Sequence, residues 1–167
     1  RSFSNSFQAQ FSFTPSNLID LLFAYKNTVA KTDYASHGRL KNPLTPSDRL
    51  FFNFAYNGTA NKKGRSWKYD FTFNHVGKQR IPSTIDNPQQ YRLPGISERL
   101  NLINTQITRV FNDSFQLYLG VENLTNYRQK NTILGADDPF GDYFDATYIY
   151  GPIFGRMTYL GLRYYIK

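Results

Sequence analysis

Residues 2–13 read SFSNSFQAQFSF and alternate between two kinds of side chain. Phe3, Phe7, Phe11 and Phe13 fall on odd positions, and serine or glutamine fills every even position. A β-strand sends successive side chains to opposite faces, whereas an α-helix would spread this pattern around its whole surface. The segment therefore predicts a strand with one apolar face and one polar face.

Two environments suit such a strand. In a soluble β-sandwich the apolar face packs against a protein core and the polar face meets water. In an outer-membrane β-barrel the apolar face meets lipid and the polar face lines the lumen. The opening segment alone fits both.

Similar alternation recurs along the whole chain and predicts an all-β fold of about seven strands. No segment has the pattern of an amphipathic helix, and the longest apolar candidate, LIDLLFAY, is interrupted by Asp20. A membrane-spanning helix needs about 20 apolar residues, whereas a spanning strand needs only about 9 to 11. The predicted strands lie at about 2–14, 18–34, 47–59, 65–80, 98–111, 115–130 and 146–167.

The connections between these segments alternate in length. Short turns are expected at 14–17, 60–64 and 112–114, and long links at 35–46, 81–97 and about 131–145. This alternation is typical of a transmembrane barrel, which has short periplasmic turns and longer outer loops. A sandwich has no reason to sort its loops in this way. We therefore predict an antiparallel transmembrane β-barrel wall whose C-terminus lies on the side of the short turns, in the periplasm.

The alternation also assigns side chains to faces. Aromatic residues near the short turns, such as Tyr56 and Trp67, are expected to form an interfacial girdle. The residues predicted to face lipid are Phe7, Phe11, Phe52, Phe54, Tyr69, Phe71, Leu117, Leu119, Leu160 and Leu162. The residues predicted to face the lumen are Arg49, Asn53, Lys68, Asp70, Asn104, Gln106, Tyr118, Glu122 and Arg163.

Three hairpin registers follow from the rule that paired residues share a face. The first hairpin should pair Phe13 with Ile19, Phe11 with Leu21 and Phe7 with Tyr25. The second should pair Tyr56 with Trp67, Phe54 with Tyr69, Phe52 with Phe71 and Leu50 with Phe73. The third should pair Ile107 with Leu119 and Phe111 with Phe115 across a three-residue connection or a bulge. In this arrangement Arg109 lies on the apolar face near a short turn, and Arg156 lies on that face near the long links.

Composition argues against several functions. The net charge is +8, but the cations are scattered, so we expect no nucleic-acid binding. There is no cysteine, no Ser-His-Asp arrangement and no phosphate-binding glycine loop, so we expect no enzyme, catalytic residue or cofactor. His37 and His75 stand apart from each other, and we predict no metal site there. The acidic cluster Asp137, Asp138, Asp142 and Asp145 has oxygen ligands but lacks EF-hand spacing, so a solvated loop is favoured.

Aromatic and charged residues in two predicted long links are candidates for ligand recognition. Tyrosine and arginine combine a large contact area with hydrogen bonding, which suits binding surfaces. The alternative is that these side chains pack the loops against one another. The candidate ligand-binding residues are Tyr91, Arg92, Asp137, Asp138, Phe140, Tyr143 and Phe144.

Residues 120–167, GVENLTNYRQKNTILGADDPFGDYFDATYIYGPIFGRMTYLGLRYYIK, resemble the closing strands of TonB-dependent outer-membrane receptors. The Gly-x-x-Asn-Leu-x-Asn motif of that family corresponds to Gly120, Asn123, Leu124 and Asn126. Further likeness runs through RLKNPLTPSDRLFFNFAYN (39–57) and WKYDFTFNHVGKQRIPST (67–84). Two departures are Thr125, where an aromatic residue is common, and the ending Ile166-Lys167, where many outer-membrane proteins end on phenylalanine.

The resemblance implies that residues 1–167 form the C-terminal part of a barrel of about 22 strands, with the plug domain absent from this chain. It further implies active import of a scarce nutrient, such as an iron chelate, haem, cobalamin or a glycan, across the outer membrane of a Gram-negative bacterium. The implied partners are the remaining barrel strands and plug, the TonB, ExbB and ExbD proteins, and outer-membrane lipid. The alternative is a small structural or adhesive outer-membrane barrel that does not transport.

Overall fold

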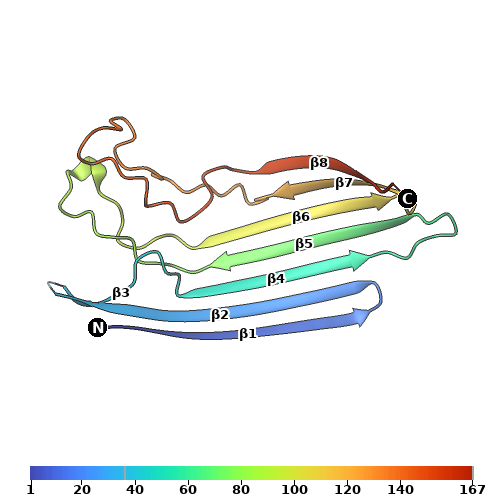
Figure 1. The fold of residues 1–167 in the computed structure, drawn as a ribbon, viewed down its shortest axis with the longest axis horizontal. Coiled ribbons are helices and arrows are strands. Elements are labelled where there is room, and N and C mark those ends of the chain that lie inside the picture. The colour runs from blue at the N-terminus through green and yellow to red at the C-terminus, as the bar shows by residue number, and fades with distance from the viewer. Residues whose placement is uncertain (36, 167) are drawn as a thin grey trace.

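The computed structural model describes residues 1–35 and 37–166 and contains a single antiparallel sheet (Figure 1). The described residues contain no α-helix and one short 3-10 helix, η1 (Gln89–Tyr91). The all-β prediction is confirmed. The strands are β1 (Ser2–Ser16), β2 (Ile19–Tyr34), β3 (Gly38–Lys41), β4 (Asp48–Asn57), β5 (Ser66–Val76), β6 (Leu100–Val110), β7 (Phe115–Glu122) and β8 (Met157–Tyr164).

The sheet is open, with β1 and β8 at its two edges. Its order is β1-β2-β4-β5-β6-β7-β8, so every strand on this path pairs with its neighbour along the chain, apart from β3. The short strand β3 pairs only with the end of β2 and lies inside the link predicted at 35–46. Eight strands therefore form where about seven were predicted.

Cross-strand pairing collects the apolar residues on one face of the sheet. Phe11 pairs with Phe23, Phe23 with Phe52, Phe52 with Phe73, and Phe73 with Ile103. Because paired residues share a face and side chains alternate along each strand, all ten residues predicted to face lipid lie on this apolar face. All nine residues predicted to face the lumen lie on the opposite, polar face.

Two of the predicted hairpin registers are wrong by two residues. Phe13 pairs with Leu21, not Ile19, because a bulge between Phe13 and Ser16 precedes the turn. Phe54 pairs with Phe71, not Tyr69, because the β4–β5 turn is longer than expected. In that turn the side-chain oxygen of Asn61 accepts hydrogen bonds from the backbone of Lys63 (2.9 Å) and Arg65 (3.1 Å). A shift of two residues leaves every side chain on its predicted face.

The same shift of two residues applies to the other predicted pairs of these two hairpins. In the first hairpin Phe11 pairs with Phe23 and Phe7 with Asn27. In the second, Tyr56 pairs with Tyr69, Phe52 with Phe73 and Leu50 with His75.

The β6–β7 hairpin has the predicted register. Ile107 pairs with Leu119, and the backbone of Phe111 donates to the carbonyl of Phe115 at 3.0 Å. The three-residue connection is held by Asn112, whose side-chain oxygen accepts from the backbone of Ser114 at 2.9 Å and of Phe115 at 2.8 Å. Arg109 lies on the apolar face, as predicted, and it pairs with Trp67 of β5.

The last two strands are shorter than predicted. β7 ends at Glu122, not near residue 130, and β8 begins at Met157, not at residue 146. Asn123 has a positive φ of 51°, which lies outside the β region, and this turns the chain out of β7. The alternation of residues 146–156 therefore belongs to a folded link. Arg156 lies one residue before β8, at the long-link end as predicted.

The sheet is a single layer with no core beneath it. Among the described residues no large side chain is fully buried, and the exposed surface is 11594 Å², whereas a globular protein of this mass exposes about 8,500 Å². The buried apolar cluster of Ile81, Leu134 and Tyr148 lies in the long links. Those links gather at one end of the sheet, and the short turns and the C-terminus lie at the other (Figure 1). No helix in the described part of the chain has the length and apolar character to cross a membrane.

Candidate functional sites

The motif residues Asn123 and Asn126 fasten the end of β7 to the beginning of β8. The buried side chain of Asn123 donates to the carbonyls of Tyr127 (2.7 Å) and Phe154 (3.2 Å) and accepts from the backbone of Tyr127 (3.0 Å). Asn126 accepts from the backbone of Arg156 at 2.9 Å. Both asparagines have positive φ, which asparagine tolerates better than most residues. The motif therefore has a local structural role.

A second buried amide orders the link between β7 and β8. Gln129 donates to the carbonyl of Tyr148 at 2.8 Å and accepts from the backbone of Tyr150 (2.7 Å) and Gly151 (2.9 Å). Burial, together with Tyr150 and Glu98, raises the pKa of nearby Tyr127 to about 12. The long links thus form a hydrogen-bonded cap at one end of the sheet.

A pocket of about 280 Å³ lies within this cap. The ring of Tyr91, positioned by η1, stacks on the ring of Tyr143 with centroids 5.3 Å apart and planes 19° apart. The hydroxyl of Tyr91 donates to Asp137 at 3.5 Å. Residues lining the pocket are Tyr91, Gly135, Asp138, Gly141, Asp142, Tyr143 and Phe144.

The structure brings together five of the seven candidate ligand-binding residues, namely Tyr91, Asp137, Asp138, Tyr143 and Phe144. Arg92 is exposed and donates to the carbonyl of Asn87 at 2.8 Å, away from the pocket. Phe140 is fully exposed and is not part of the lining. Because two tyrosine rings form one wall and carboxylates another, the pocket suits a ligand that combines an apolar face with hydrogen-bond donors.

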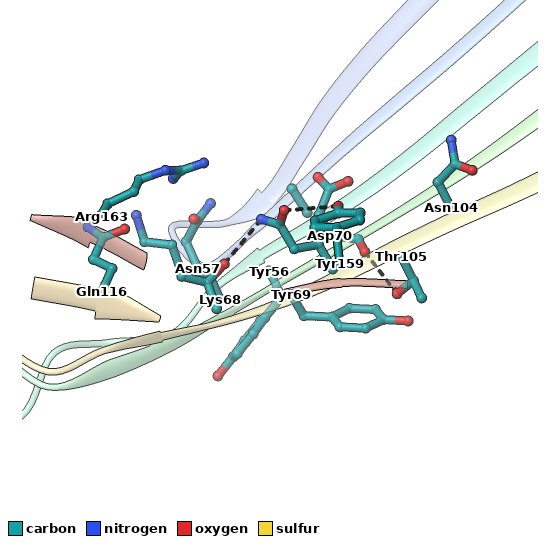
Figure 2. A pocket seen from close by; sticks show the side chains of 13 residues that line it. Tyr56, Asn57, Lys68, Tyr69, Asp70, Asn104, Thr105, Gln116, Tyr159 and Arg163 are labelled. Carbon is teal, nitrogen blue, oxygen red and sulfur yellow. Dashed lines mark hydrogen bonds between the residues drawn. The ribbon is translucent and has the colours of Figure 1, made fainter. Parts of the chain in front are cut away.

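A second cavity, of about 270 Å³, lies on the polar face near the short turns (Figure 2). Its lining includes five of the nine residues predicted to face the lumen, namely Lys68, Asp70, Asn104, Gln106 and Arg163. Gln106 makes two side-chain hydrogen bonds in this cavity. It accepts from the hydroxyl of Tyr159 at 3.1 Å and donates to Thr108 at 3.2 Å. Asp70 in turn accepts from Asn53 at 3.2 Å.

Glycines make room for tyrosine rings on this face. Tyr159 pairs with Gly120 and Tyr118 pairs with Gly161 on adjacent strands. A Cβ at either glycine would overlap the ring opposite it. Arg163 then stacks over Tyr118 at 4.9 Å from the ring centroid. The sequence showed that these residues share a face, but only the β7–β8 register reveals that they are partners.

The acidic loop cluster and the histidines do not form a metal centre in the described part of the chain. There, no group of three histidine, cysteine or acidic residues is placed to hold a metal ion. His75 does have a carboxylate neighbour that the sequence did not reveal: Asp48 lies 3.3 Å away, on the adjacent strand. His75 also hydrogen-bonds Asn101 at 2.6 Å.

Comparison with known proteins gives no match: no family model, curated protein or solved structure matches this chain. The functional argument therefore depends on the sheet, its two faces and the two cavities.

Proposed function

We propose that this chain is part of the barrel wall of a TonB-dependent transporter in a Gram-negative outer membrane, and that its long links help to capture a scarce nutrient. The observation that carries the proposal is the single-layer sheet with one mainly apolar face and one mainly polar face. Exposed Phe7, Phe11, Leu160 and Leu162 would be unfavourable in water, whereas lipid accommodates them.

The distribution of aromatic residues supports a membrane position. Trp67 and Tyr164 lie near the short turns on the apolar face, where an interfacial girdle is expected. The guanidinium of Arg109 lies 4.7 Å from the centroid of the Trp67 ring. An arginine stacked on an aromatic side chain at this level can extend its charge towards lipid head groups.

The unpaired edges of the sheet favour the presence of further strands in the proposed barrel. Both edges, β1 and β8, leave backbone groups without a strand partner, which is unfavourable in lipid. Additional strands that close a barrel would pair with these edges. The polar face, which carries Lys68, Asp70 and Arg163, would then line a hydrated lumen.

The test uses the full-length protein that contains this chain. Deletion of its gene, and separately of TonB, should abolish growth on one limiting nutrient from a panel of ferric siderophores, haemin, cyanocobalamin and maltodextrins. Suppose instead that the protein folds in the outer membrane and that its deletion changes growth on no nutrient of the panel. That result would favour the structural or adhesive barrel.

The loop pocket has its own test within this proposal. Tyr91→Ala and Tyr143→Ala should each weaken binding of the transported nutrient about tenfold or more, because they remove the stacked wall. Phe140→Ala removes an exposed aromatic from the same link and should leave affinity unchanged. Normal affinity in both tyrosine variants would mean that these rings only pack the loops together.

A further inference from the structure

The largest of the described cavities, about 650 Å³, lies between the end of β2, β3 and the links that follow. Five cationic side chains contribute to its lining, and we call them the basic rim. Val29, Leu40 and Ile96 provide apolar wall beside them. The residues of the basic rim are Lys31, Arg39, Lys41, Lys78 and Arg80.

The basic rim brings five cations together, and of these only Arg39 has an ion pair with a carboxylate among the described residues. Lys31 pairs directly with Lys41 across β2 and β3, an arrangement that destabilises a sheet unless an anion intervenes. Asp33, an acid beside the rim, is already bound by Arg39 at 2.7 Å. In the described ranges no ion pair joins Lys31, Lys41 or Lys78 to a carboxylate.

The rim adjoins the apolar face. Phe3 pairs with Lys31, so both side chains lie on that face, and the guanidinium of Arg39 lies 5.6 Å from the centroid of the Phe3 ring. Phe3, Phe7 and Val29 are exposed beside it. A ligand here meets cations at the long-link end and hydrocarbon surface along the strands.

Arg80 fixes the geometry of the rim. Its guanidinium donates to the carbonyl of Lys41 at 2.6 Å and to the hydroxyl of Tyr34 at 3.4 Å. These bonds tie the link after β5 to β3. The lysines of the rim are therefore carried by segments that are joined to one another.

We propose that the basic rim binds the phosphate groups of an anionic lipid, whose acyl chains lie along Phe3, Phe7 and Val29. Charge-assisted hydrogen bonds from lysine and arginine to phosphate are strong, and a phosphate between Lys31 and Lys41 relieves their repulsion. Only the assignment of this lipid to the outer leaflet rests on the proposed function.

The experiment compares two triple variants of the full-length protein in zwitterionic detergent. The rim variant carries Lys31→Gln, Lys41→Gln and Lys78→Gln. The control carries Lys62→Gln, Lys63→Gln and Arg65→Gln, which remove the same charge from the exposed β4–β5 turn at the opposite end of the sheet. Binding of lipid A, a diphosphorylated lipid, is measured against the same lipid without its phosphates.

The rim variant should bind lipid A at least about tenfold more weakly, because each cation near anionic lipid contributes several-fold to affinity. The control should stay within about twofold of the parent, and the dephosphorylated lipid should bind weakly to all three proteins. Equal losses in both variants, or equal binding of both lipids, would overturn the proposal.

A further arm separates a lipid from a soluble anion. If inorganic phosphate alone bound the rim as tightly as lipid A, the site would serve a free anion and the lipid assignment would be wrong. Heat-modifiable gel migration verifies that each variant is folded. Nutrient uptake is recorded separately, so failure of lipid binding and failure of transport are distinguishable.

Discussion

At the scale of single residues, the buried amides of Asn123 and Gln129 order the link between β7 and β8. Asn123 makes four side-chain hydrogen bonds, to Tyr127, Phe154 and Thr125, in a backbone conformation with φ of 51°. Removing one partner of a buried hydrogen bond leaves the other unsatisfied. Asn123 therefore has a structural role in the turn from β7 into the link.

Asn123→Ala should lower the free energy of unfolding by about 2 to 4 kcal/mol, because it removes the buried amide that donates to the carbonyls of Tyr127 and Phe154. Asn131→Ala is the control: its φ is similarly positive, at 50°, but its side chain is exposed. Thermal unfolding in detergent measures both. If both variants lost the same free energy of unfolding, the effect would come from the backbone conformation and not from the hydrogen bonds of Asn123.

The raised pKa of Tyr127, about 12, predicts a loss of stability at alkaline pH. Below pH 10 this tyrosine is neutral in both the folded and unfolded chain, so it has no pH-dependent effect. Between pH 10 and 12 the unfolded chain binds fewer protons than the folded one, so the free energy of unfolding falls as pH rises. Tyr127→Phe should flatten this decline.

The measurement for Tyr127 is tyrosinate absorbance during an alkaline titration. Subtracting the titration of Tyr127→Phe from that of the parent should leave a component with a midpoint near pH 12. A difference component near pH 10 would mean that Tyr127 is accessible to solvent and that burial does not govern its ionisation.

At the scale of elements, β7 and β8 interlock through glycine and tyrosine. Gly120→Ala should displace the Tyr159 ring and break its hydrogen bond to Gln106, at a cost of roughly 1 to 3 kcal/mol. Gly95→Ala is the control, since a Cβ there meets no other atom within 4 Å. Chemical denaturation of the folded protein in detergent compares them. A smaller loss for Gly120→Ala than for Gly95→Ala would contradict the interlock.

The sequence predicted faces better than it predicted registers or links. Alternation alone assigns Phe52 and Phe71 to one face, since the side-chain period of a strand is two. It does not reveal the bulge after Phe13, which a proline without an N–H at position 15 accompanies. It also does not reveal that Tyr91 stacks on Tyr143, because contacts between distant links depend on how those links fold.

At the scale of the whole molecule, the two faces of the sheet differ in polarity, so a charge introduced on one face should have a different effect from a charge introduced on the other. Leu160 pairs with Leu119 and is well exposed on the apolar face, whereas Gln10 is exposed on the polar face. Tyr159, the neighbour of Leu160, also lies on the polar face but packs against Tyr118. The same substitution at these three positions therefore separates the effect of placing a charge on the apolar face from the effect of losing a packed side chain.

On the proposed placement of the apolar face in lipid, Leu160→Arg should impair assembly more than Tyr159→Arg, and Gln10→Arg should be nearly neutral. A charge on a lipid-facing strand costs roughly 2 to 4 kcal/mol at the middle of the bilayer, whereas a charge towards a lumen stays hydrated. Tyr159→Arg loses the bond to Gln106 but adds its charge beside polar groups. Heat-modifiable migration of the full-length variants in membranes gives the folded fraction of each. Equal folded fractions for Leu160→Arg and Gln10→Arg would mean that the apolar face is covered by protein and does not meet lipid.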